Sequence, residues 1–394
     1  MPQDLRNADV DWARLRDRYP AAGQWVFLNA GSRGLLSKTA HAAGLASLDG
    51  ELAMSKDGPS LASQQDDLRR LFAQLINGGA AEIAVTKNVS EGLNLVAGAI
   101  DWRVGDNVVL STDVEHANNI YLGLSLARRG VEVRDVPTRA GAIDPEAMAK
   151  AIDARTRIVT ASAVTFTSGF RTDVAPIGRA ARAAGALFLV DGVQACGVID
   201  VDVERDCIDA LATSTSKGLL GVRGLGMLYV RKDWARKLTP PQIARNSVDS
   251  KGKHYSEFEG GSFDLWPDAR RFEAGTTNQT GIAIARAALG EILDIGIDAV
   301  ESRAVGLATQ LAEGLRAQGW PVVDPPQGIR RTHLLVLGDR GPGGPESTGD
   351  PRLDRLAGVL EANRVRFSIR RRLVRFGFHF YNDESDVETV LSLA

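Results

Sequence analysis

The sequence predicts an α/β protein with a mainly parallel central sheet and a smaller second domain. Between residues 60 and 235, short apolar segments typical of buried strands alternate with segments of helical periodicity. From residue 280 onward, helices and strands follow in a different order, which indicates a separate α+β domain. We therefore predict a large domain over residues 60–279 and a small C-terminal domain over residues 280–394. Residues 1–59 are expected to contribute to the small domain.

The expected elements can be followed along the chain. After a charged start, residues 25–36 read as a short strand and a glycine-rich turn, and residues 62–78 read as a helix. The expected strands of the large domain lie at 82–88, 106–112, 131–137, 157–164, 186–192, 207–215 and 226–234. The expected helices between them lie at 90–100, 116–129, 144–153 and 174–185.

Residues 238–279 interrupt this pattern because they have no clean period. So long an irregular stretch inside a compact protein is usually functional or mobile. In the C-terminal part we expect helices at 280–296, 299–319 and 352–363, strands at 332–338, 364–370 and 373–378, and a final helix. This order is typical of an α+β unit built on its own small sheet.

Composition and charge exclude several classes of function. A length of 394 residues suits one large domain plus a smaller one, and a net charge of −2 gives no electrostatic reason to bind nucleic acid or an acidic membrane. The start of the chain lacks an apolar core typical of a secretory signal, and no 18-residue apolar run predicts a membrane helix. The two cysteines, Cys196 and Cys207, form no CxxC pair and predict no metal site. We expect a cytoplasmic protein; a cytoplasmic enzyme fits these features, and so would any other soluble protein.

A carboxylate and an amine follow two neighbouring apolar segments of the large domain. Asp191 ends the segment LFLVD, and Lys217 follows the segment ALATSTS. An amine at such a strand end can form a Schiff base with the aldehyde of pyridoxal 5′-phosphate (PLP), and a carboxylate can keep the pyridine nitrogen protonated. On its segment alone Lys217 is equally acceptable as a loop lysine, and Asp191 alone is more typical of a structural loop aspartate, but the pair favours a PLP site.

Several polar residues at the same expected sheet edge can supply the other contacts. Gln194 can donate a hydrogen bond to the phenolate oxygen of the cofactor. Ser90 lies near the start of a helix, where it can be a simple N-cap or, with the amide of Val89, part of an anion site for the phosphate. Ser214 and Ser216 can add hydroxyl contacts to that phosphate.

Two further residues stand out by their chemical type. His116 follows an expected strand, so its imidazole can stack on the pyridine ring and exchange protons, although a lone histidine is more often structural. Arg375 lies within an apolar strand, where its guanidinium needs a partner. That partner is either a substrate carboxylate or an acidic side chain of the small domain.

Six motifs in this order resemble the class V aminotransferase superfamily of PLP enzymes, which have fold type I. The motifs are TKNVSEGLN, EHANN, VDGVQACG, STSKG, RRFEAGTTN and VRFGFHFYN, and the resemblance covers nearly the whole chain. The superfamily includes cysteine desulfurases, kynureninases, isopenicillin N epimerase-like proteins and C–S lyases. The resemblance implies a homodimer with composite active sites and an amino acid as the substrate.

The resemblance also implies a role for each matching residue. Lys217 would be the Schiff-base lysine, Asp191 would pair with the pyridinium nitrogen, Gln194 with the phenolate oxygen, and His116 would stack on the ring. Val89, Ser90, Ser214 and Ser216 would hold the phosphate, and Thr276 would reach the phosphate of the other subunit. Arg375 would bind the substrate carboxylate, with Asn29 and Ser32 as possible contacts from the N-terminal loop.

The sequence departs from the desulfurase pattern at two places. A desulfurase needs a nucleophilic cysteine on a loop shortly before the arginine that matches Arg375, and residues 340–374 contain no cysteine. Phe166 stands where desulfurases carry an asparagine. The segment TSGFRTD is more similar to kynureninases, epimerases and C–S lyases. We therefore expect a lyase or an epimerase-like enzyme, with a true aminotransferase as the alternative and a non-catalytic protein of the same fold as a weaker one.

Overall fold

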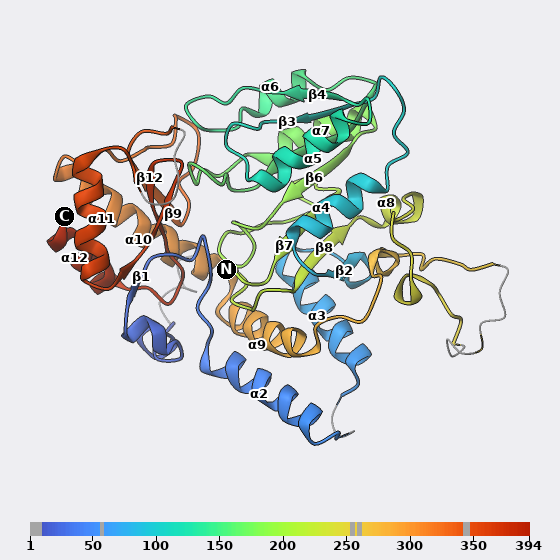
Figure 1. The fold of residues 1–394 in the computed structure, drawn as a ribbon, viewed down its shortest axis with the longest axis horizontal. Coiled ribbons are helices and arrows are strands. Elements are labelled where there is room, and N and C mark those ends of the chain that lie inside the picture. Colours follow the sequence, from blue (N-terminus) through green and yellow to red (C-terminus); the bar gives the residue numbers. More distant parts are fainter. Residues whose placement is uncertain (1–9, 56–58, 253–256, 258–261, 342–346) are drawn as a thin grey trace, which may run out of the picture.

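A seven-stranded sheet forms the centre of the molecule (Figure 1). The computed structural model describes residues 10–55, 59–252, 257, 262–341 and 347–394. The sheet has the order β2-β8-β7-β6-β5-β3-β4. Its strands are β2 (Ile83–Thr86), β3 (Asn107–Leu110), β4 (Glu132–Asp135), β5 (Thr156–Ser162), β6 (Leu187–Asp191), β7 (Ala210–Ser214) and β8 (Gly226–Val230). Every neighbouring pair is parallel except those made by β8, which runs antiparallel to β2 and β7.

Helices connect these strands and shield the sheet from water, which explains why the strands read as continuous apolar runs. All residues of β2, β3, β6 and β8 are buried, as expected for strands covered on both faces. The connecting helices are α4 (Val89–Gly98), α5 (Ala117–Ala127), α6 (Pro145–Lys150) and α7 (Val174–Ala184), and a further helix, α8 (Lys232–Lys237), follows β8. The predicted α/β architecture with a mainly parallel sheet is confirmed.

The C-terminal part is built on an antiparallel sheet of order β11-β12-β9. Its elements are α10 (Ile297–Ala317), β9 (Leu334–Leu337), α11 (Pro351–Ala362), β10 (Val365–Arg366), β11 (Ser368–Arg370), β12 (Leu373–Gly377) and α12 (Glu384–Leu393). Near the other end of the chain, β1 (Val26–Phe27) pairs in parallel with β10. The N-terminal segment is therefore joined to the C-terminal part, while the domain boundaries at residues 59 and 279 stay a prediction.

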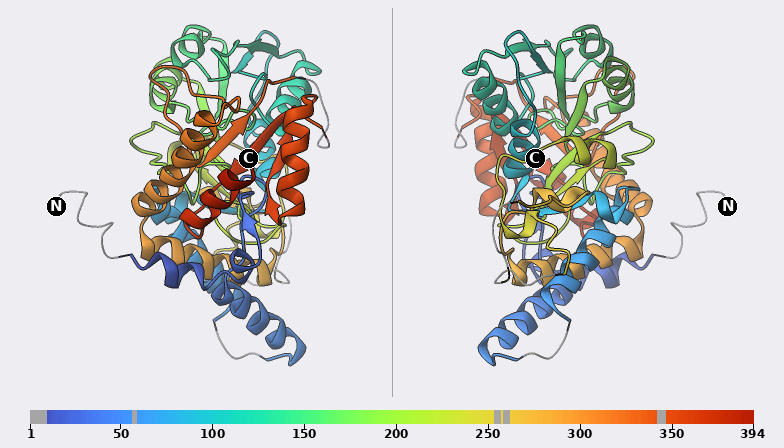
Figure 2. Two further views of the ribbon diagram at one scale, coloured as in Figure 1. Left: turned by 90° about the vertical axis from the view of Figure 1, so that its left-hand side faces the viewer. Right: turned by 90° about the vertical axis from the view of Figure 1, so that its right-hand side faces the viewer.

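Three long helices pack together beside the central sheet. They are α2 (Lys38–Leu52), α3 (Leu61–Leu75) and α9 (Gln279–Ile295). Helix α2 projects from the body of the molecule (Figure 2). Three of its leucines, Leu45, Leu48 and Leu52, are exposed to solvent.

The remaining elements are short. Helix α1 spans Trp12–Arg16, and four 3₁₀ turns span Pro20–Gly23, Ala80–Glu82, Arg245–Ser247 and Ala269–Phe272. Two of these turns lie in the irregular stretch 238–279, of which residues 253–256 and 258–261 are outside the described residues. No helix in the described part of the chain combines the length and apolarity needed to cross a bilayer. Within the same residues, no three His, Cys, Asp or Glu side chains are grouped to hold a metal ion.

Candidate active site

Three of the predicted site residues, Asp191, Ser214 and Lys217, meet at one edge of the central sheet. Strands β6 and β7 are parallel neighbours, and their last residues are Asp191 and Ser214. Lys217 follows three residues after β7 ends. Because the carboxyl ends of parallel strands share an edge, the carboxylate and the amine lie together, as in the ligand sites of open α/β sheets.

Asp191 is buried and firmly held. Its Oδ1 accepts a hydrogen bond from the amide of Val193 at 2.9 Å, and its Oδ2 accepts one from Asn119 Nδ2 at 3.2 Å. Burial raises the pKa of Asp191, while these hydrogen bonds and the positive charge of Lys217 act in the opposite direction. A positive group placed beside the carboxylate would favour its charged form further.

The Lys217 side chain is partly buried between opposing charges, with Arg375 and Arg370 on one hand and Asp191 on the other. Burial, and then the charge of Arg375, lower the pKa of Lys217 to about 8, although Asp191 opposes this shift. An amine with such a pKa is neutral much more often near physiological pH than an ordinary lysine, and only the neutral amine is a nucleophile.

The N-terminal loop packs directly against the Lys217 segment. The amide of Gly34 donates to the carbonyl of Ser216 at 2.9 Å. A Cβ at position 34 would lie 2.3 Å from the carbonyl oxygen of Lys217, so only glycine permits this approach. The expected contribution of residues 1–59 to the site therefore has a structural basis in this loop.

The His116 ring is held in one orientation. His116 is the N-cap of α5, and its Nδ1 accepts a hydrogen bond from the amide of Asn118 at 3.2 Å, which leaves the proton on Nε2. The ring meets Phe166 edge to face, with 4.8 Å between the ring centres. Burial, followed by the charges of Lys217 and Arg375, lowers the pKa of His116 and favours the neutral imidazole.

Gln194 is buried beside the N-terminal loop. Its Nε2 donates to the carbonyl of Gly31 at 2.9 Å, while its Oε1 is buried without a hydrogen-bond partner. A Cβ at position 31 would lie 3.4 Å from that Oε1 and 2.8 Å from Leu334, so glycine again keeps the loop close. The predicted contact of Gln194 with a phenolate oxygen stays a prediction.

The candidate phosphate site lies at the start of α4. The N-cap of α4 is Asn88, whose side chain accepts from the amide of Glu91 at 2.9 Å, and not Ser90, which lies in the first turn. The amide of Val89 donates to the hydroxyl of Ser214 at 3.0 Å. The structure therefore brings Val89 and Ser214 together at a helix N-terminus, where an anion is favoured.

Ser216 and Thr276 occupy different environments. Ser216 is partly buried in the segment before Lys217. Thr276 is exposed in the loop before α9, and this loop is fixed by a hydrogen bond of 2.7 Å from Asn246 Nδ2 to the carbonyl of Gly275. An exposed Thr276 is compatible with a contact across a subunit interface, which stays a prediction.

Arg375 is a buried guanidinium without an acidic partner. Its exposed fraction is 2%. Its hydrogen bonds go to the carbonyl of Phe166 at 2.9 Å, the carbonyl of Gly31 at 3.4 Å and the hydroxyl of Ser32 at 3.4 Å. Burial and the neighbouring Arg370 lower the pKa of Arg375 to about 9, and no described carboxylate opposes this effect. The salt bridge that the sequence left open as an alternative is not found among the described residues.

Of the two predicted N-terminal contacts, only Ser32 reaches Arg375 with its side chain. Asn29 is partly buried and forms a β-bridge with Gly377 at the end of β12. Its carbonyl accepts from the amides of Ser32 and Arg33 at 2.9 and 3.0 Å. Asn29 therefore shapes the turn that presents Ser32 to the site.

The sequence analysis missed a buried acid behind Asp191. Glu115 accepts from the amide of Ser162 at 2.7 Å and from Asn119 Nδ2 at 2.6 Å, so Asn119 bridges Glu115 and Asp191. Burial and the nearby Asp191 raise the pKa of Glu115 to about 7. The only signal in the sequence was its position directly before His116. Its burial in the structure indicates a role, since buried carboxylates are rarely without one.

His379 was missed as well. Its Nδ1 accepts from the amide of Phe380 at 2.9 Å, so its Nε2 carries the proton and donates to the carbonyl of Gly218 at 2.9 Å. Burial lowers the pKa of His379 to about 4. This neutral ring fixes the backbone directly after Lys217 from the C-terminal part of the chain.

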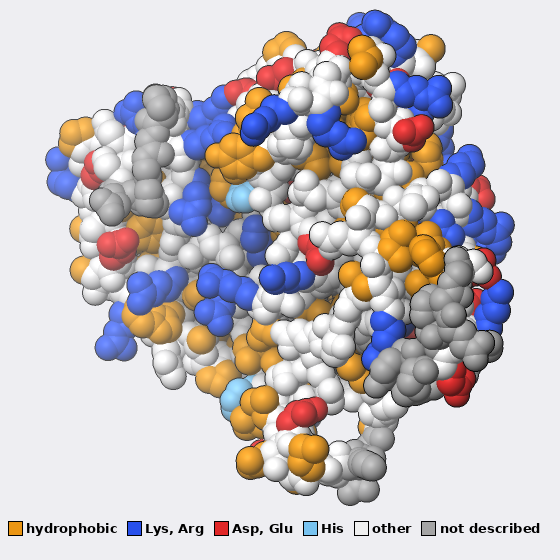
Figure 3. Space-filling model, turned by 45° about the vertical axis from the view of Figure 1, so that its right-hand side comes forward, with side chains coloured by type: hydrophobic (Ala, Val, Ile, Leu, Met, Phe, Trp, Pro, Cys, Tyr) orange, Lys and Arg blue, Asp and Glu red, His pale blue; other side chains and the backbone are white. Residues whose placement is uncertain are grey.

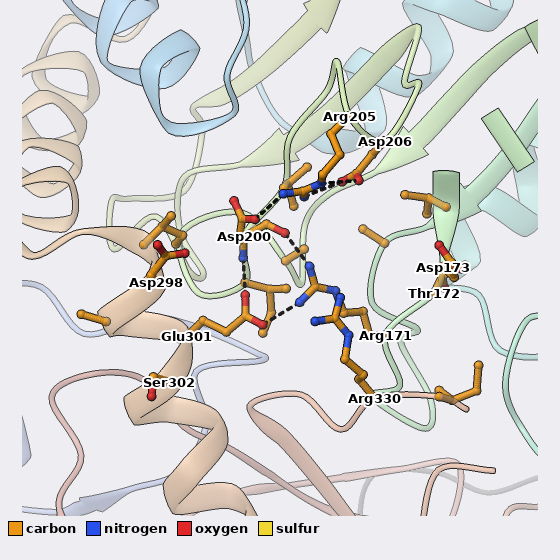
Figure 4. Close-up of a pocket in the computed structure, with 18 of the residues that line it drawn as sticks. Arg171, Thr172, Asp173, Asp200, Arg205, Asp206, Asp298, Glu301, Ser302 and Arg330 are labelled. Atoms are coloured by element: carbon orange, nitrogen blue, oxygen red, sulfur yellow. Dashed lines mark hydrogen bonds and ion pairs between the residues drawn. The ribbon is translucent and has the colours of Figure 1, made fainter. Parts of the chain in front are cut away.

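A separate cavity lies away from these residues. A cavity of about 1000 Å³ opens beside α10, and none of the predicted site residues lines it (Figure 4). Its charged side chains are mostly paired with each other: Arg171 contacts Glu301 at 2.6 Å, and Arg205 contacts Asp200 at 2.7 Å. By contrast, no carboxylate among the described residues forms an ion pair with Arg375 beside Lys217.

Comparison with known proteins agrees with this geometry. The family model described as aminotransferase class V matches residues 49–334. A probable cysteine desulfurase of Pyrococcus abyssi is 30% identical over 83% of this chain and 82% of its own length. A probable cysteine desulfurase of Methanothermobacter thermautotrophicus is 35% identical over 62% of this chain, a match that spans 60% of that protein.

A solved structure shows the same fold. The cysteine desulfurase CsdA from Escherichia coli superposes with a TM-score of 0.82 and 22% identity over 98% of this chain and 97% of the other. The family match covers most of the chain, and it includes the Asp191 and Lys217 segments. The chain therefore belongs to the class V aminotransferase family of PLP-dependent enzymes.

Proposed function

We propose that this protein acts on an α-amino acid as a lyase, by a C–S or another elimination, or as an epimerase-like enzyme. Asp191, Lys217, His116 and Arg375 all lie around one site. We also propose that the protein works in the cytoplasm as a homodimer.

The residues around Lys217 fit the cofactor. The Lys217 amine and the Asp191 carboxylate would hold its aldehyde carbon and ring nitrogen, and the unpartnered Oε1 of Gln194 marks a buried polar position that a ligand would complete. If the Gln194 amide turned about its last bond, its NH₂ group would face that position and donate to the phenolate oxygen. The phosphate contacts would come from Val89, Ser90, Ser214, Ser216 and, across the dimer, Thr276.

Each of the four site residues would have its own role in catalysis. When bound, PLP supplies an aldehyde that exchanges between amines and a ring that withdraws electrons from Cα. Lys217 would take and return the proton at Cα, since its pKa of about 8 suits both directions near neutral pH. Asp191 would hold the ring nitrogen protonated, and His116 would cover one ring face. Arg375 would fix the carboxylate so that one bond at Cα is aligned for cleavage.

The observation that carries the proposal is the buried Arg375 without an acid. Burying an uncompensated guanidinium is costly, and the cost is removed when an anion enters. A planar carboxylate accepts two parallel hydrogen bonds from this group. An α-amino acid would place this carboxylate on Arg375 and its amine toward Lys217.

The Arg375→Lys variant is expected to bind amino-acid substrates more weakly by on the order of tenfold to a hundredfold, the effect of losing one charge-assisted hydrogen bond. It should still bind PLP with an unchanged visible absorption band. Substrate dissociation constants from spectral titration measure the effect. Unchanged substrate affinity would place the carboxylate elsewhere, most plausibly on the loop around Ser32.

Two observations favour a lyase or an epimerase-like reaction over amino transfer. The named relatives are described as cysteine desulfurases, and the segment around Phe166 departs from their pattern toward other lyases and epimerases. In the structure, Phe166 contacts His116 with its ring and Arg375 with its carbonyl, so it separates the two groups that would touch cofactor and substrate.

Product analysis distinguishes the alternatives. The holoenzyme is mixed with each amino acid that changes its spectrum, and ammonia, 2-oxo acid, sulfide and the D-enantiomer are quantified. Elimination releases the side-chain substituent, and epimerisation gives the D-enantiomer; either result supports the proposal. Catalytic transfer of the amino group to an added 2-oxo acid, with none of these products, would establish the aminotransferase alternative instead.

The Cys196→Ser/Cys207→Ser double variant is expected to keep at least half of the wild-type activity. Cys196 is buried, which raises the pKa of its thiol to about 12, and a thiol is a poor nucleophile when it stays protonated. Cys207 lies outside the site, next to the carbonyl of Arg205. Activity assays and mass spectrometry after exposure to cysteine test this expectation. Lost activity together with a persulfide trapped on either residue of the wild type would show a desulfurase mechanism.

Exposed apolar side chains support the proposed dimer. Leu52 and Met54 at the end of α2 are 86% and 83% exposed, and Leu45 and Leu48 are exposed on the same helix. Apolar groups that gather on one projecting element are typical of protein interfaces. A second copy would cover them and bring Thr276 to the cofactor of its partner.

The Thr276→Ala variant is expected to lower PLP affinity by about tenfold, the effect of one lost hydrogen bond to a charged group. Thr277→Ala is the control, because the Thr277 hydroxyl bonds to Gln65 within the same subunit. Affinity is measured by titrating the apo-protein with PLP, and mass by light scattering. A monomer that binds PLP tightly would contradict both the dimer and the role of Thr276.

A further inference from the structure

Two arginines share one face of the β11–β12 hairpin. Ser368 is paired with Arg375, and Arg370 is paired with Leu373. Because alternate residues of a strand point to the same face, Arg370 lies on the face that carries Ser368 and Arg375. Arg370 is the first of three consecutive arginines at 370–372, and it lies on the face of the hairpin that carries Arg375.

The two guanidinium groups converge on one hydroxyl. Nη2 of Arg370 lies 3.5 Å from Ser32 Oγ, and Nη2 of Arg375 lies 3.4 Å from the same atom. The other hydrogen bond of the Arg370 guanidinium goes to the carbonyl of Ile369. Among the described residues, no carboxylate bonds to either arginine. Two like charges so close to each other are unfavourable until anions neutralise them.

The turn that carries Arg370 is held against local backbone preference. Arg371 and Arg372, which link β11 to β12, have φ angles of 48° and 70°. Such a two-residue turn favours asparagine and glycine, and strained positions persist where the surrounding structure fixes them. Here Arg371 donates to the carbonyl of Asp113 at 2.6 Å and Arg372 to the carbonyl of Thr348 at 2.6 Å. Both anchors keep Arg370 in place at the site.

The positive charge of Arg370 acts on three other residues of the candidate active site. It lowers the pKa values of Lys217, His116 and Arg375. On the face that Figure 3 shows, Lys and Arg side chains gather where the C-terminal part meets the rest of the molecule. Arg370 and Arg375 therefore place two positive charges on either side of Ser32, whereas an α-carboxylate brings one negative charge.

We propose that the substrate is an α-amino acid whose side chain ends in a second anionic group, a carboxylate or a sulfinate, and that Arg370 binds this group. The inference rests on the function proposed above, in which Arg375 takes the α-carboxylate. The cofactor phosphate is not the partner of Arg370, because the candidate phosphate contacts lie at the start of α4, whereas Arg370 shares Ser32 with Arg375.

The test compares anionic amino acids with their neutral counterparts. PLP-loaded wild type and Arg370→Gln, Arg370→Lys and Arg366→Gln variants are titrated with aspartate, asparagine, glutamate, glutamine, cysteine sulfinate and alanine. Dissociation constants come from the change in the visible band, and the shift in Tm at saturating ligand gives a second readout. Arg366 is the matched control, because it is an exposed arginine of β10 that stacks on Trp25, with 3.8 Å to the ring centre.

In the wild type, at least one anionic amino acid should bind tenfold or more tightly than its neutral counterpart. Arg370→Gln should abolish this preference, Arg370→Lys should keep part of it, and Arg366→Gln should keep all of it, where the preference is the ratio of the dissociation constants of the neutral and the anionic amino acid. A wild type that binds asparagine, glutamine and alanine as tightly as the acids would overturn the proposal, as would a preference that survives in Arg370→Gln. The visible band reports the covalent link to Lys217, so its presence in each variant tests the proposed function separately.

Discussion

The Lys217→Ala variant is expected to lack the visible absorption band of the PLP-loaded protein and to show no measurable turnover. The amine that would be lost is the only group in the proposed mechanism that both holds the cofactor covalently and moves the proton at Cα. Its environment is specialised for this role, because burial and Arg375 lower its pKa to about 8. Absorption spectra and activity assays of purified protein measure both effects.

The control for this variant is Lys232→Ala, which removes an exposed lysine at the start of α8. It should keep the band and the activity. Added methylamine should restore part of the turnover of Lys217→Ala, which would show that the variant is folded. Full activity of Lys217→Ala would refute the assignment of the site.

The Asp191→Asn variant is expected to bind PLP and yet to react slower by orders of magnitude. Asparagine keeps the shape of the buried side chain but removes the charge that stabilises a protonated ring nitrogen. Each factor of ten in rate corresponds to about 1.4 kcal/mol of barrier. Stopped-flow rates measured with the ordinary and the Cα-deuterated substrate identify this step, because the Cα–H bond breaks in it.

Asp209→Asn is a matched control, because Asp209 is also buried in this sheet but pairs with Arg231 at 3.0 Å and Arg182 at 3.2 Å. It should lower the free energy of unfolding and leave the rate of the folded enzyme unchanged. A near-normal rate in Asp191→Asn would mean that the ring nitrogen has another partner.

The central sheet was predictable because its strands are buried on both faces. A segment such as Leu187–Asp191 must then be apolar throughout, and the polar residue that ends it marks the sheet edge. Strand direction was not predictable, since an apolar run does not indicate that β8 lies antiparallel between β2 and β7. The pairing of β1 with β10 joins segments from opposite ends of the chain, and no local pattern reveals such a contact.

The candidate site residues that the sequence alone could suggest are those with unusual chemistry for their position. Lys217, Asp191, His116 and Arg375 each break an apolar or strand-end pattern with a reactive or charged side chain. Glu115 and Arg370 were missed, because in the sequence a glutamate beside a histidine, or an arginine in an arginine-rich turn, is typical of a solvent-exposed residue. Only the tertiary structure shows that Glu115 is buried against Asn119 and that Arg370 faces Arg375 through Ser32.

The most direct test of the central claim is to locate the covalent link between the protein and its cofactor. The PLP-loaded protein is reduced with borohydride, digested and analysed by mass spectrometry. We predict a phosphopyridoxyl group on Lys217 alone, with loss of the visible band in proportion to the modification. A cofactor that is released intact after reduction, or a label found on another lysine, would contradict the account.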